Sequence, residues 1–225
     1  MNHDQQRRAA NRNLSYKLAE SLGQDILTGK YEQGSILPGE IELCDMYKIS
    51  RTAVREAIKM LAAKGMVLPR PRIGTRVLPK ESWNYLDQDL LMWIELDKHP
   101  EMIDEFKFIR RILEPQAAAM SALNAKKEER AQLKQVMKQL HEINNDFNQH
   151  SWTEADTQFY QLIYFSSGNH FLSPFGNLFK AIFKNYFMMV NRDSIASVDA
   201  HQHLVDAILA RDPEMAKQAS LELLN

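Results

Sequence analysis

Apolar residues recur at helical spacing through most of this chain. The first such set forms a stripe in which each member follows the one before by four residues: Leu14, Leu18, Leu22 and Ile26. That spacing places the stripe on one face of a helix, which Gly29 ends. Residues 40–47 predict a short second helix. Ser50 is placed to cap a third helix, which buries one face and ends at Gly65.

The period changes directly after the third predicted helix. Residues 66–68 and 75–78 are rich in β-prone side chains, and the segment PRPRIG lies between them. Its prolines and glycine suit the tip of a hairpin better than a paired strand. Three helices followed by a two-stranded ribbon, with a tight connection at 48–50, predict a winged helix-turn-helix over residues 14–78.

Beyond residue 85 the pattern is helical throughout. The expected helices share apolar residues at i, i+3 and i+4, and they span 86–97, 100–124, 128–149, 152–166, 171–191, 198–211 and 213–224. The predicted inward face of the second of these comprises Phe108, Ile112, Pro115 and Ala119. No alternating strand pattern follows Pro79.

The predicted fold class is therefore mainly α, with a winged helix-turn-helix followed by an all-α helical bundle. Residues 79–85 are expected to form a linker, and the bundle to occupy residues 86–225. The polar residues 1–13 are expected to form a disordered N-terminal arm. We expect the bundle to bind an effector and to mediate dimerisation.

Composition narrows the class of protein. With 225 residues, of which 44% are hydrophobic, the chain can form one large or two ordinary domains with real cores. Cys44 is the single cysteine, so an internal disulfide is excluded, and no Cys/His cluster has zinc-finger spacing. No window approaches the roughly 18 apolar residues of a membrane span, and no signal peptide is recognisable. We expect a soluble protein of the reducing cytoplasm.

Charge is distributed unevenly along the chain. The formal net charge is −1, yet residues 1–80 carry 14 Lys/Arg and 8 Asp/Glu, a balance of +6, while residues 81–225 carry 14 and 21, a balance of −7. A basic N-terminal region followed by an acidic remainder suggests that the N-terminal region meets a polyanion. Charge that is merely solvated is the alternative.

The first turn of the third predicted helix carries side chains suited to DNA. Arg51 and Arg55 are four residues apart and share a face, and either could bind the O6 and N7 atoms of guanine. Thr52 and the helix N-terminus that Ser50 caps suit a phosphate. The alternative is an ordinary surface ion pair between Arg55 and its neighbour Glu56.

The predicted hairpin adds further arginines. Arg70, Arg72 and Arg76 surround prolines that stiffen the tip. Such side chains would follow a phosphate backbone or enter a minor groove. A solvated hairpin tip is the alternative for each of them.

These residues carry a resemblance to a known family. The stretches GKYEQGSILPGEIEL, SRTAVREAIKMLAAKGMV and GTRV resemble the DNA-binding region of GntR-family bacterial transcription regulators. The resemblance implies that Arg51 and Arg55 read bases, that Thr52 makes a neighbouring contact, and that Gly74 is the wing-tip glycine.

The chain departs from the GntR pattern in two places. Ile41 stands between Glu40 and Glu42, where members often carry Arg or Lys. Arg72 occupies a position that often holds glycine. These departures put contact by the second helix in question and suggest that the wing compensates.

The remainder of the chain resembles the all-helical ligand-binding domain of the FadR subfamily. The matching elements are Arg110 to Glu114, Asp156 to Tyr160, the Ser-Gly-Asn at 167–169, and the stretch from His201 to Asp212. The segment from Trp83 to Trp93 resembles the linker of regulators of sugar-acid operons, notably the galactonate repressor group.

The resemblance to the FadR subfamily implies a site inside the bundle. Members bind a divalent metal there through an aspartate and up to three histidines, and Asp156 and His201 match two of those ligands. Tyr160 stands where a histidine is usual, and Leu223 falls where another often lies. A zinc-like metal is thus one interpretation, and a core His201 hydrogen-bonded to Asp156 is the other.

Effector binding is predicted to use several of the same residues. Arg110 could hold a carboxylate in a polar cavity, or it could extend to solvent along an apolar surface. Tyr160 could contribute its hydroxyl, alongside Asp156 and His201. Arg192 is a second candidate for a carboxylate contact.

The sequence therefore predicts a cytoplasmic homodimeric DNA-binding regulator with no catalytic residues. We expect a repressor of a sugar-acid (aldonate or hexuronate) catabolic operon, which leaves its palindromic operator when a small carboxylate binds. A hydroxy acid, an amino acid or an acyl thioester is the alternative effector. A metal-dependent helical enzyme is the rival class, but the sequence contains no nucleophile elbow, phosphate loop or complete metal-ligand set.

Overall fold

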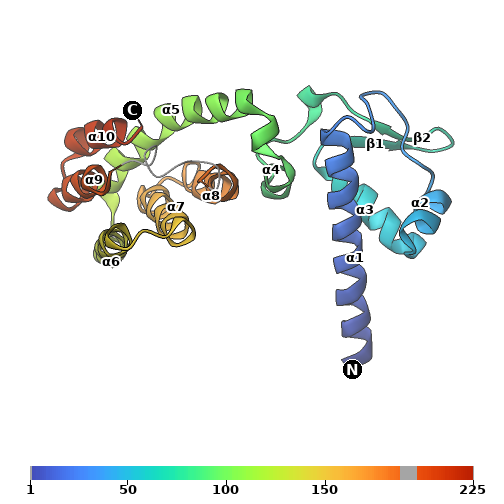
Figure 1. Cartoon of the computed structure of the whole chain (residues 1–225), viewed down its shortest axis with the longest axis horizontal. Coiled ribbons are helices and arrows are strands. Elements are labelled where there is room, and N and C mark those ends of the chain that lie inside the picture. Colours follow the sequence, from blue (N-terminus) through green and yellow to red (C-terminus); the bar gives the residue numbers. More distant parts are fainter. Residues whose placement is uncertain (1, 188–196, 225) are drawn as a thin grey trace. The chain divides into compact units, whose positions relative to one another are not determined.

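The computed structural model describes residues 2–187 and 197–224, without the side chains of residues 2–12 and 184–187. The chain divides into two compact units, Met1–Ile94 and Glu95–Asn225, and each is described by itself. Figure 1 shows the helices and the small hairpin. None of the helices in the described parts has the length and hydropathy needed to cross a bilayer.

The first unit is a winged helix-turn-helix with an added helix, which confirms the predicted fold class. Its elements in chain order are α1 (Asn2–Leu27), α2 (Glu40–Tyr47), α3 (Arg51–Ala63), β1 (Val67–Arg70), β2 (Gly74–Val77), the 3-10 turn η1 (Lys80–Ser82) and α4 (Gln88–Trp93). α1 begins at Asn2, so residues 2–13 continue the helix, whereas the sequence had suggested a disordered arm.

The core of the first unit follows the predicted apolar faces closely. Leu18, Leu22 and Ile26 of α1 are buried, although Leu14 at the start of the stripe is 43% exposed. On α3 the buried residues fall on one side of the helix: Ala53, Val54, Ala57, Ile58 and Leu61. Because α1 and α3 bury these faces against each other, the opposite face of α3 stays open to solvent.

The wing is an antiparallel hairpin that is attached to the loop before α2. β1 pairs with β2 from Val67↔Val77 to Arg70↔Gly74, so β1 runs through Pro69, which the sequence had suggested would lie in the tip. Pro69 is tolerated because β1 is an edge strand. On the other side of β2, the Leu37 amide donates to the Thr75 carbonyl at 2.8 Å. β2 therefore has main-chain partners on both sides, β1 on one and the loop before α2 on the other.

The segment after the wing belongs to the first unit. Trp83, Leu90 and Trp93 are part of its hydrophobic core, and the unit ends only at Ile94. This differs from the expected linker at 79–85 and bundle from 86. The expected helix over 86–97 is interrupted as well, because Asp87 caps the short α4 and the chain is extended at Ile94 and Glu95, before the 3-10 turn η2 (Leu96–Lys98).

Gly65 allows a close approach that no other residue could make. Its φ is +72°, and a Cβ there would lie 2.0 Å from the Ser82 carbonyl oxygen. Gly29 is a matched control, because its φ is +80° but a Cβ would meet nothing within 4 Å. We expect Gly29→Ala to lower the free energy of unfolding by about 1 kcal/mol, from backbone strain alone. Gly65→Ala should cost about 1–3 kcal/mol more from overpacking. Equal losses in denaturant unfolding would contradict the close approach.

The second unit is an all-α bundle, as the sequence predicts. Its main helices are α5 (Pro100–Asn124), α6 (Lys127–Asn145), α7 (Gln149–Ser166), α8 (Ser173–Phe187), α9 (Val198–Ala210) and α10 (Pro213–Glu222). Figure 1 shows α5 along one side of this unit, with α7 and α8 on the same side of it. On α7 the rings of Phe159 and Tyr164 are fully buried.

The inward face of α5 differs from the predicted one. Phe108 is 64% exposed and Ile112 is 48% exposed, although Pro115 is buried as expected. The inward face instead combines apolar and polar residues: Phe106, Arg110, Glu114, Pro115, Ala117, Ala118, Ser121 and Ala122. The prediction was wrong for Phe108 and Ile112 because it took the inward face from the apolar residues, whereas the buried pair Arg110 and Glu114 occupies the middle of that face.

Candidate nucleic-acid interface and buried polar cluster

The open face of α3 begins with a capped turn. The Ser50 hydroxyl accepts a hydrogen bond from the Ala53 amide at 3.2 Å, which holds the first turn in place. Arg51, Thr52 and Arg55 are all exposed on this turn and the next. The structure therefore places the residues predicted to contact DNA together on the solvent-exposed face of α3.

The two arginines of α3 have different surroundings. Arg55 Nε lies 2.9 Å from a carboxylate oxygen of Glu40, at the start of α2, while Glu56 pairs with Lys59. The suggested pair between Arg55 and Glu56 is thus replaced by one with Glu40. Arg51 forms no ion pair within the described residues. Both members of the Arg55–Glu40 pair are exposed, and such pairs contribute only about 0–1 kcal/mol, so a DNA group can compete for this arginine.

The predicted wing residues lie on the hairpin as expected. Arg70, Arg72 and Arg76 are exposed, and none of them forms an ion pair within the described part of the chain. Gly74 has a φ of +107°, and a Cβ there would lie 2.7 Å from the Cγ2 atom of Ile36. Gly74 is therefore needed where the wing passes the loop before α2.

The wing tip has a turn that normally uses glycine. Pro71 and Arg72 are its central residues, and the Ile73 amide donates to the Arg70 carbonyl at 3.3 Å. The φ of Arg72 is +63°, the left-handed conformation that a type II turn requires at this position. The chain thus keeps an arginine at the tip in spite of the backbone strain.

Arg72→Gly should separate the strain from the charge. Glycine adopts this φ without steric cost, so we expect the free energy of unfolding to rise by up to about 1 kcal/mol. If Arg72 contacts a phosphate, the slope of log binding constant against log salt should fall in magnitude by about 1, for every DNA sequence alike. Fluorescence anisotropy at several salt concentrations measures the slope, and Arg72→Ala, which keeps the strain, is the control. An unchanged slope would remove Arg72 from the interface.

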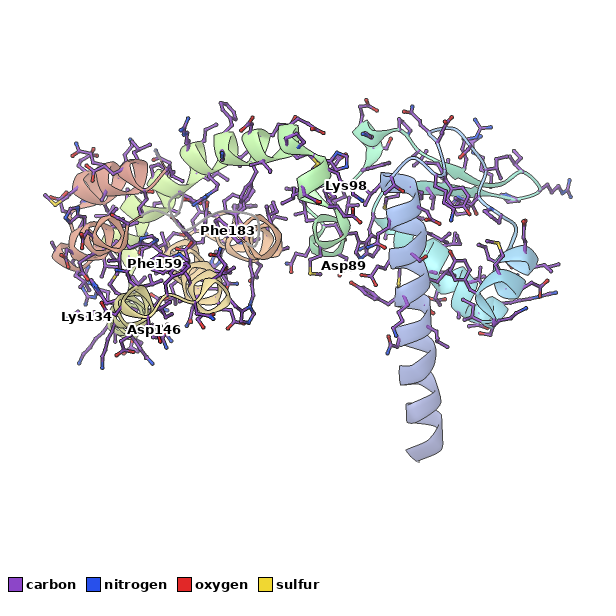
Figure 2. The ribbon with its side chains drawn as sticks, viewed as in Figure 1. Asp89, Lys98, Lys134, Asp146, Phe159 and Phe183 are labelled. Atoms are coloured by element: carbon purple, nitrogen blue, oxygen red, sulfur yellow. The ribbon has the colours of Figure 1, made fainter. Side chains whose placement is uncertain are left out.

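A buried ion pair occupies the interior of the second unit. Arg110 Nε donates to Glu114 at 2.6 Å and Nη2 donates to its other carboxylate oxygen at 3.2 Å. The guanidinium carbon lies 4.8 Å from the ring centre of Tyr160 and 4.6 Å from that of Phe183. Figure 2 labels Phe183 and Phe159 among the helices of this unit. Arg110 therefore enters the interior and does not extend to solvent.

Asp156 and His201 form a second buried pair. His201 Nε2 lies 2.8 Å from an Asp156 carboxylate oxygen, and Nδ1 lies 2.9 Å from the Ser197 carbonyl. Because a carbonyl only accepts, Nδ1 donates the hydrogen bond to Ser197. Both ring nitrogens are thus engaged, which fits the interpretation of His201 as a hydrogen-bonded core residue.

Tyrosines extend this polar interior along α7. Burial raises the pKa of Tyr160 well above its ordinary value, although Arg110 acts in the opposite direction. Burial raises the pKa of Tyr164 as well, and the charge of Glu114 adds to the effect. Both phenols are therefore protonated at neutral pH. Among the described residues of the second unit, three buried groups have no hydrogen-bond partner: Trp152 Nε1, Thr157 Oγ1 and Tyr164 OH.

The residues around Asp156 and His201 do not fit a divalent metal. Among the described residues, no three His, Cys, Asp or Glu side chains come together, and protein zinc sites usually have more than two such ligands. The protonated, buried phenol of Tyr160 and the aliphatic Leu223 cannot complete the set. Arg110, stacked on Tyr160, would also repel a cation.

The structure thus unites most of the predicted effector residues. Arg110 on α5, Asp156 and Tyr160 on α7, and His201 on α9 line one interior, whereas Arg192 lies outside the described residues. The sequence alone indicated no role for Glu114, the partner of Arg110, or for the other polar members of α7. The sequence spacing does indicate this shared interior, because four residues of α7 follow one another at intervals of four and so lie on one face of the helix: Trp152, Asp156, Tyr160 and Tyr164.

The fold and these two sites define a class of protein. A winged helix-turn-helix with exposed arginines, followed in the chain by a helical unit with a polar interior, is the organisation of a ligand-responsive transcription regulator. Residues 14–77 match the family described as "Bacterial regulatory proteins, gntR family", and residues 106–225 match the "FCD domain". The chain belongs to the GntR family, in the branch with an FCD domain. It is a DNA-binding transcription regulator and not an enzyme.

Known relatives agree over nearly the full length. The chain is 46% identical over 220 residues to the uncharacterized HTH-type transcriptional regulator YieP of Escherichia coli (strain K12), covering 97% of this chain and 96% of that protein. It is 31% identical over 217 residues to the galactonate operon transcriptional repressor of the same organism, with 94% of each chain covered. It is 26% identical over 230 residues to the repressor NanR of Salmonella newport, covering 96% of this chain and 84% of that one.

Among solved structures, the fold is similar to Streptococcus agalactiae GntR. The TM-score is 0.53 at 21% identity, with 93% of this chain and 96% of that chain covered. At this identity the likeness concerns the fold alone.

Proposed function

We propose that this regulator is a cytoplasmic homodimeric repressor of a sugar-acid catabolic operon and that a small carboxylate bound in the second unit releases it from DNA. The buried guanidinium of Arg110 carries the proposal, because it is a fixed cation in an interior that also contains unpartnered polar groups. The name of one relative, the galactonate operon transcriptional repressor, supports a sugar acid as the effector.

The chemistry of the interior suits a hydroxylated carboxylate. The hydrogen bonds to Glu114 use Nε and Nη2 of Arg110, and the guanidinium has further N–H donors for a second carboxylate. The hydroxyl of Tyr164, on the same face of α7 as Tyr160, has no hydrogen-bond partner among the described residues and can bond to a hydroxyl of an aldonate or hexuronate. Leaving such buried groups unpaired costs free energy, which a matching ligand would recover.

An incoming carboxylate would compete with Glu114 for Arg110. Burial raises the pKa of Glu114, although the nearby Arg110 lowers it. A Glu114 that loses part of its contact with Arg110 can therefore take up a proton and remain inside. The ligand favours the conformation that it binds best. We therefore expect α5 to rearrange around Arg110 and Glu114 as the first step that leads from ligand binding to release of DNA.

Two copies would be needed to read an operator. A single winged unit spans too few base pairs for genomic specificity, and a two-fold dimer reads an inverted repeat. Phe108, Ile109 and Ile112 form an exposed apolar stripe on α5, at 64%, 41% and 48% exposure. Covering this stripe with a second copy would remove apolar surface from water.

The test starts from an operator obtained by selection from random double-stranded DNA. Titration calorimetry with aldonates and hexuronates, galactonate first, should identify a sugar acid that binds, and binding should weaken operator affinity. Linkage requires DNA to weaken ligand affinity by the same factor. Neutral galactose is the control and should not bind, because it has no carboxylate for Arg110.

Three results would contradict parts of the proposal. A sugar acid that binds without changing operator affinity would refute the switch. Binding only of an amino acid, a hydroxy acid or an acyl thioester would move the regulator to another class of operon. Sedimentation of the DNA-free protein as a monomer at micromolar concentration would refute the dimer.

A further inference from the structure

A buried lysine lies at the end of the recognition helix. Lys64 follows the last residue of α3, and its side chain is only 6% exposed. Its ammonium donates to Asp87 Oδ1 at 2.6 Å and to Asp89 Oδ2 at 2.9 Å, and it lies 5.0 Å from the ring centre of Trp93. Figure 2 labels Asp89 beside α1 and α4. Lys64 thus places its charge against residues 87–89, which lie shortly before the first unit ends at Ile94.

The backbone around Lys64 holds the same segment. The Lys64 carbonyl accepts a hydrogen bond from the Asn84 amide at 2.8 Å. The next residue, Gly65, passes so close to Ser82 that a Cβ would lie 2.0 Å from its carbonyl oxygen. Main chain and side chain of Lys64 therefore both attach residues 82–89 to the C-terminal end of α3.

The two aspartates have further tasks in this attachment. Asp87 Oδ1 also accepts from the Leu90 amide at 2.9 Å and so caps α4. Asp89 Oδ1 accepts from the hydroxyl of Tyr16 on α1 at 3.3 Å, and the Tyr16 ring meets Trp93 edge to face. One ammonium thus connects α1, α3 and α4.

Because Lys64 is buried, the segment around Asp87 and Asp89 can separate from the end of α3 only if Lys64 moves as well. Burial lowers the pKa of Lys64, but its hydrogen bonds to Asp87 and Asp89 outweigh that effect and raise it overall. A buried ammonium that loses its carboxylates is costly, so the segment cannot leave α3 while Lys64 stays in place. The end of α3 and residues 82–93 should therefore move as one body.

We propose that Lys64 is the positioning residue that couples the recognition helix to the segment entering the second unit. Lys64 touches no DNA in this proposal; it sets the direction in which the chain leaves the first unit and thereby the spacing at which two recognition helices are held. A change in the second unit would reach α3 through Asp87, Asp89 and Lys64. The part of the proposal that concerns spacing rests on the dimeric reading of DNA proposed above.

Hydrogen exchange on the full chain tests the attachment without any ligand. In Lys64→Met, which keeps the length of the side chain, the amides of Asn84, Leu90 and Leu91 should exchange about tenfold faster. Amides in the middle of α1 and in α2 should keep their rates, and Lys64→Arg should restore protection. Lys138→Met is the matched control, because Lys138 pairs with Glu142 on the surface at 77% side-chain exposure. Unchanged rates at all three amides in Lys64→Met would overturn the proposal.

DNA spacing tests the positioning role. A set of palindromes made from one selected half-site at different separations is titrated with each variant. Lys64→Met should bind an isolated half-site within about twofold of the wild type, because Arg51 and Arg55 are untouched, but its preference for one separation should fall about fivefold or more. A preference equal to that of the wild type would overturn the positioning role.

The two proposals fail in different ways. If the wild type shows no preference for any separation, the two-headed reading of DNA is wrong, and the exchange rates alone decide the attachment by Lys64. If Lys64→Met does not fold, Asp87→Asn with Asp89→Asn replaces it. Asparagine still caps α4 but removes the negative charges, so the same amides should lose protection.

Discussion

Alanine at Arg51 or at Arg55 is expected to weaken operator binding by about 1–3 kcal/mol and to relax specificity at a single base position. Both side chains are exposed on the first two turns of α3, and the cap at Ser50 fixes those turns. Removing a bidentate bond to guanine leaves other positions of the site unaffected. Anisotropy titrations against a library of single-base operator variants measure affinity and specificity together.

Arg76→Ala on the wing is the matched control for the two recognition arginines. If Arg76 binds a phosphate, this variant should weaken all sequences alike and leave the base preferences unchanged. Glu40→Gln is informative too, because it removes the carboxylate that lies 2.9 Å from Arg55 Nε. If Glu40 orients Arg55, this variant should relax the same base position as Arg55→Ala. Normal operator binding by both Arg51→Ala and Arg55→Ala would refute the proposed recognition surface.

Breaking the Arg110–Glu114 pair is expected to have the largest effect on stability. Arg110→Met leaves a buried carboxylate without its partner, and Glu114→Leu leaves a buried guanidinium, so each should lower the free energy of unfolding by about 3–5 kcal/mol. The double variant removes both charges and should recover most of that loss. Guanidinium unfolding followed by circular dichroism measures the three variants against the wild type.

The double variant also separates stability from ligand binding. Arg110→Met with Glu114→Leu should fold and bind operator, yet it should no longer bind the sugar acid, because the fixed cation is gone. Lys138→Met, which breaks an exposed pair of the same i, i+4 spacing, should change stability by no more than about 0.5 kcal/mol. A stable Arg110→Met single variant that still binds the sugar acid would contradict both the buried pair and the proposed carboxylate contact.

The sequence was most informative where local pattern and tertiary packing agree. The stripe through Leu18, Leu22 and Ile26 and the capped start of α3 at Ser50 predicted elements that the structure contains. The motifs around Arg51 identified the family that the comparisons establish. In these segments the hydrophobic period, the cap and the turn residues all point to the same element.

The sequence was least informative where polar residues turn inward. Phe108 and Ile112 were assigned to the core because they are apolar, yet α5 buries Arg110 and Glu114 on the opposite side. A carboxylate four residues after an arginine is normally a surface pair, and only its enclosure by other helices makes it a buried one. Periodicity alone could not distinguish these two cases.

Chain order and local pattern determined by themselves that this protein has a winged DNA-binding unit followed by a helical bundle, since caps, turns and apolar periods are short-range signals. Only the tertiary structure decided that Arg110 meets Tyr160 and that Lys64 meets Asp87 and Asp89, and it selected the His201–Asp156 hydrogen bond from the two interpretations that the sequence left open. Those partners are far apart in the sequence or depend on burial. Their pairing follows from the need to neutralise charge wherever packing excludes water.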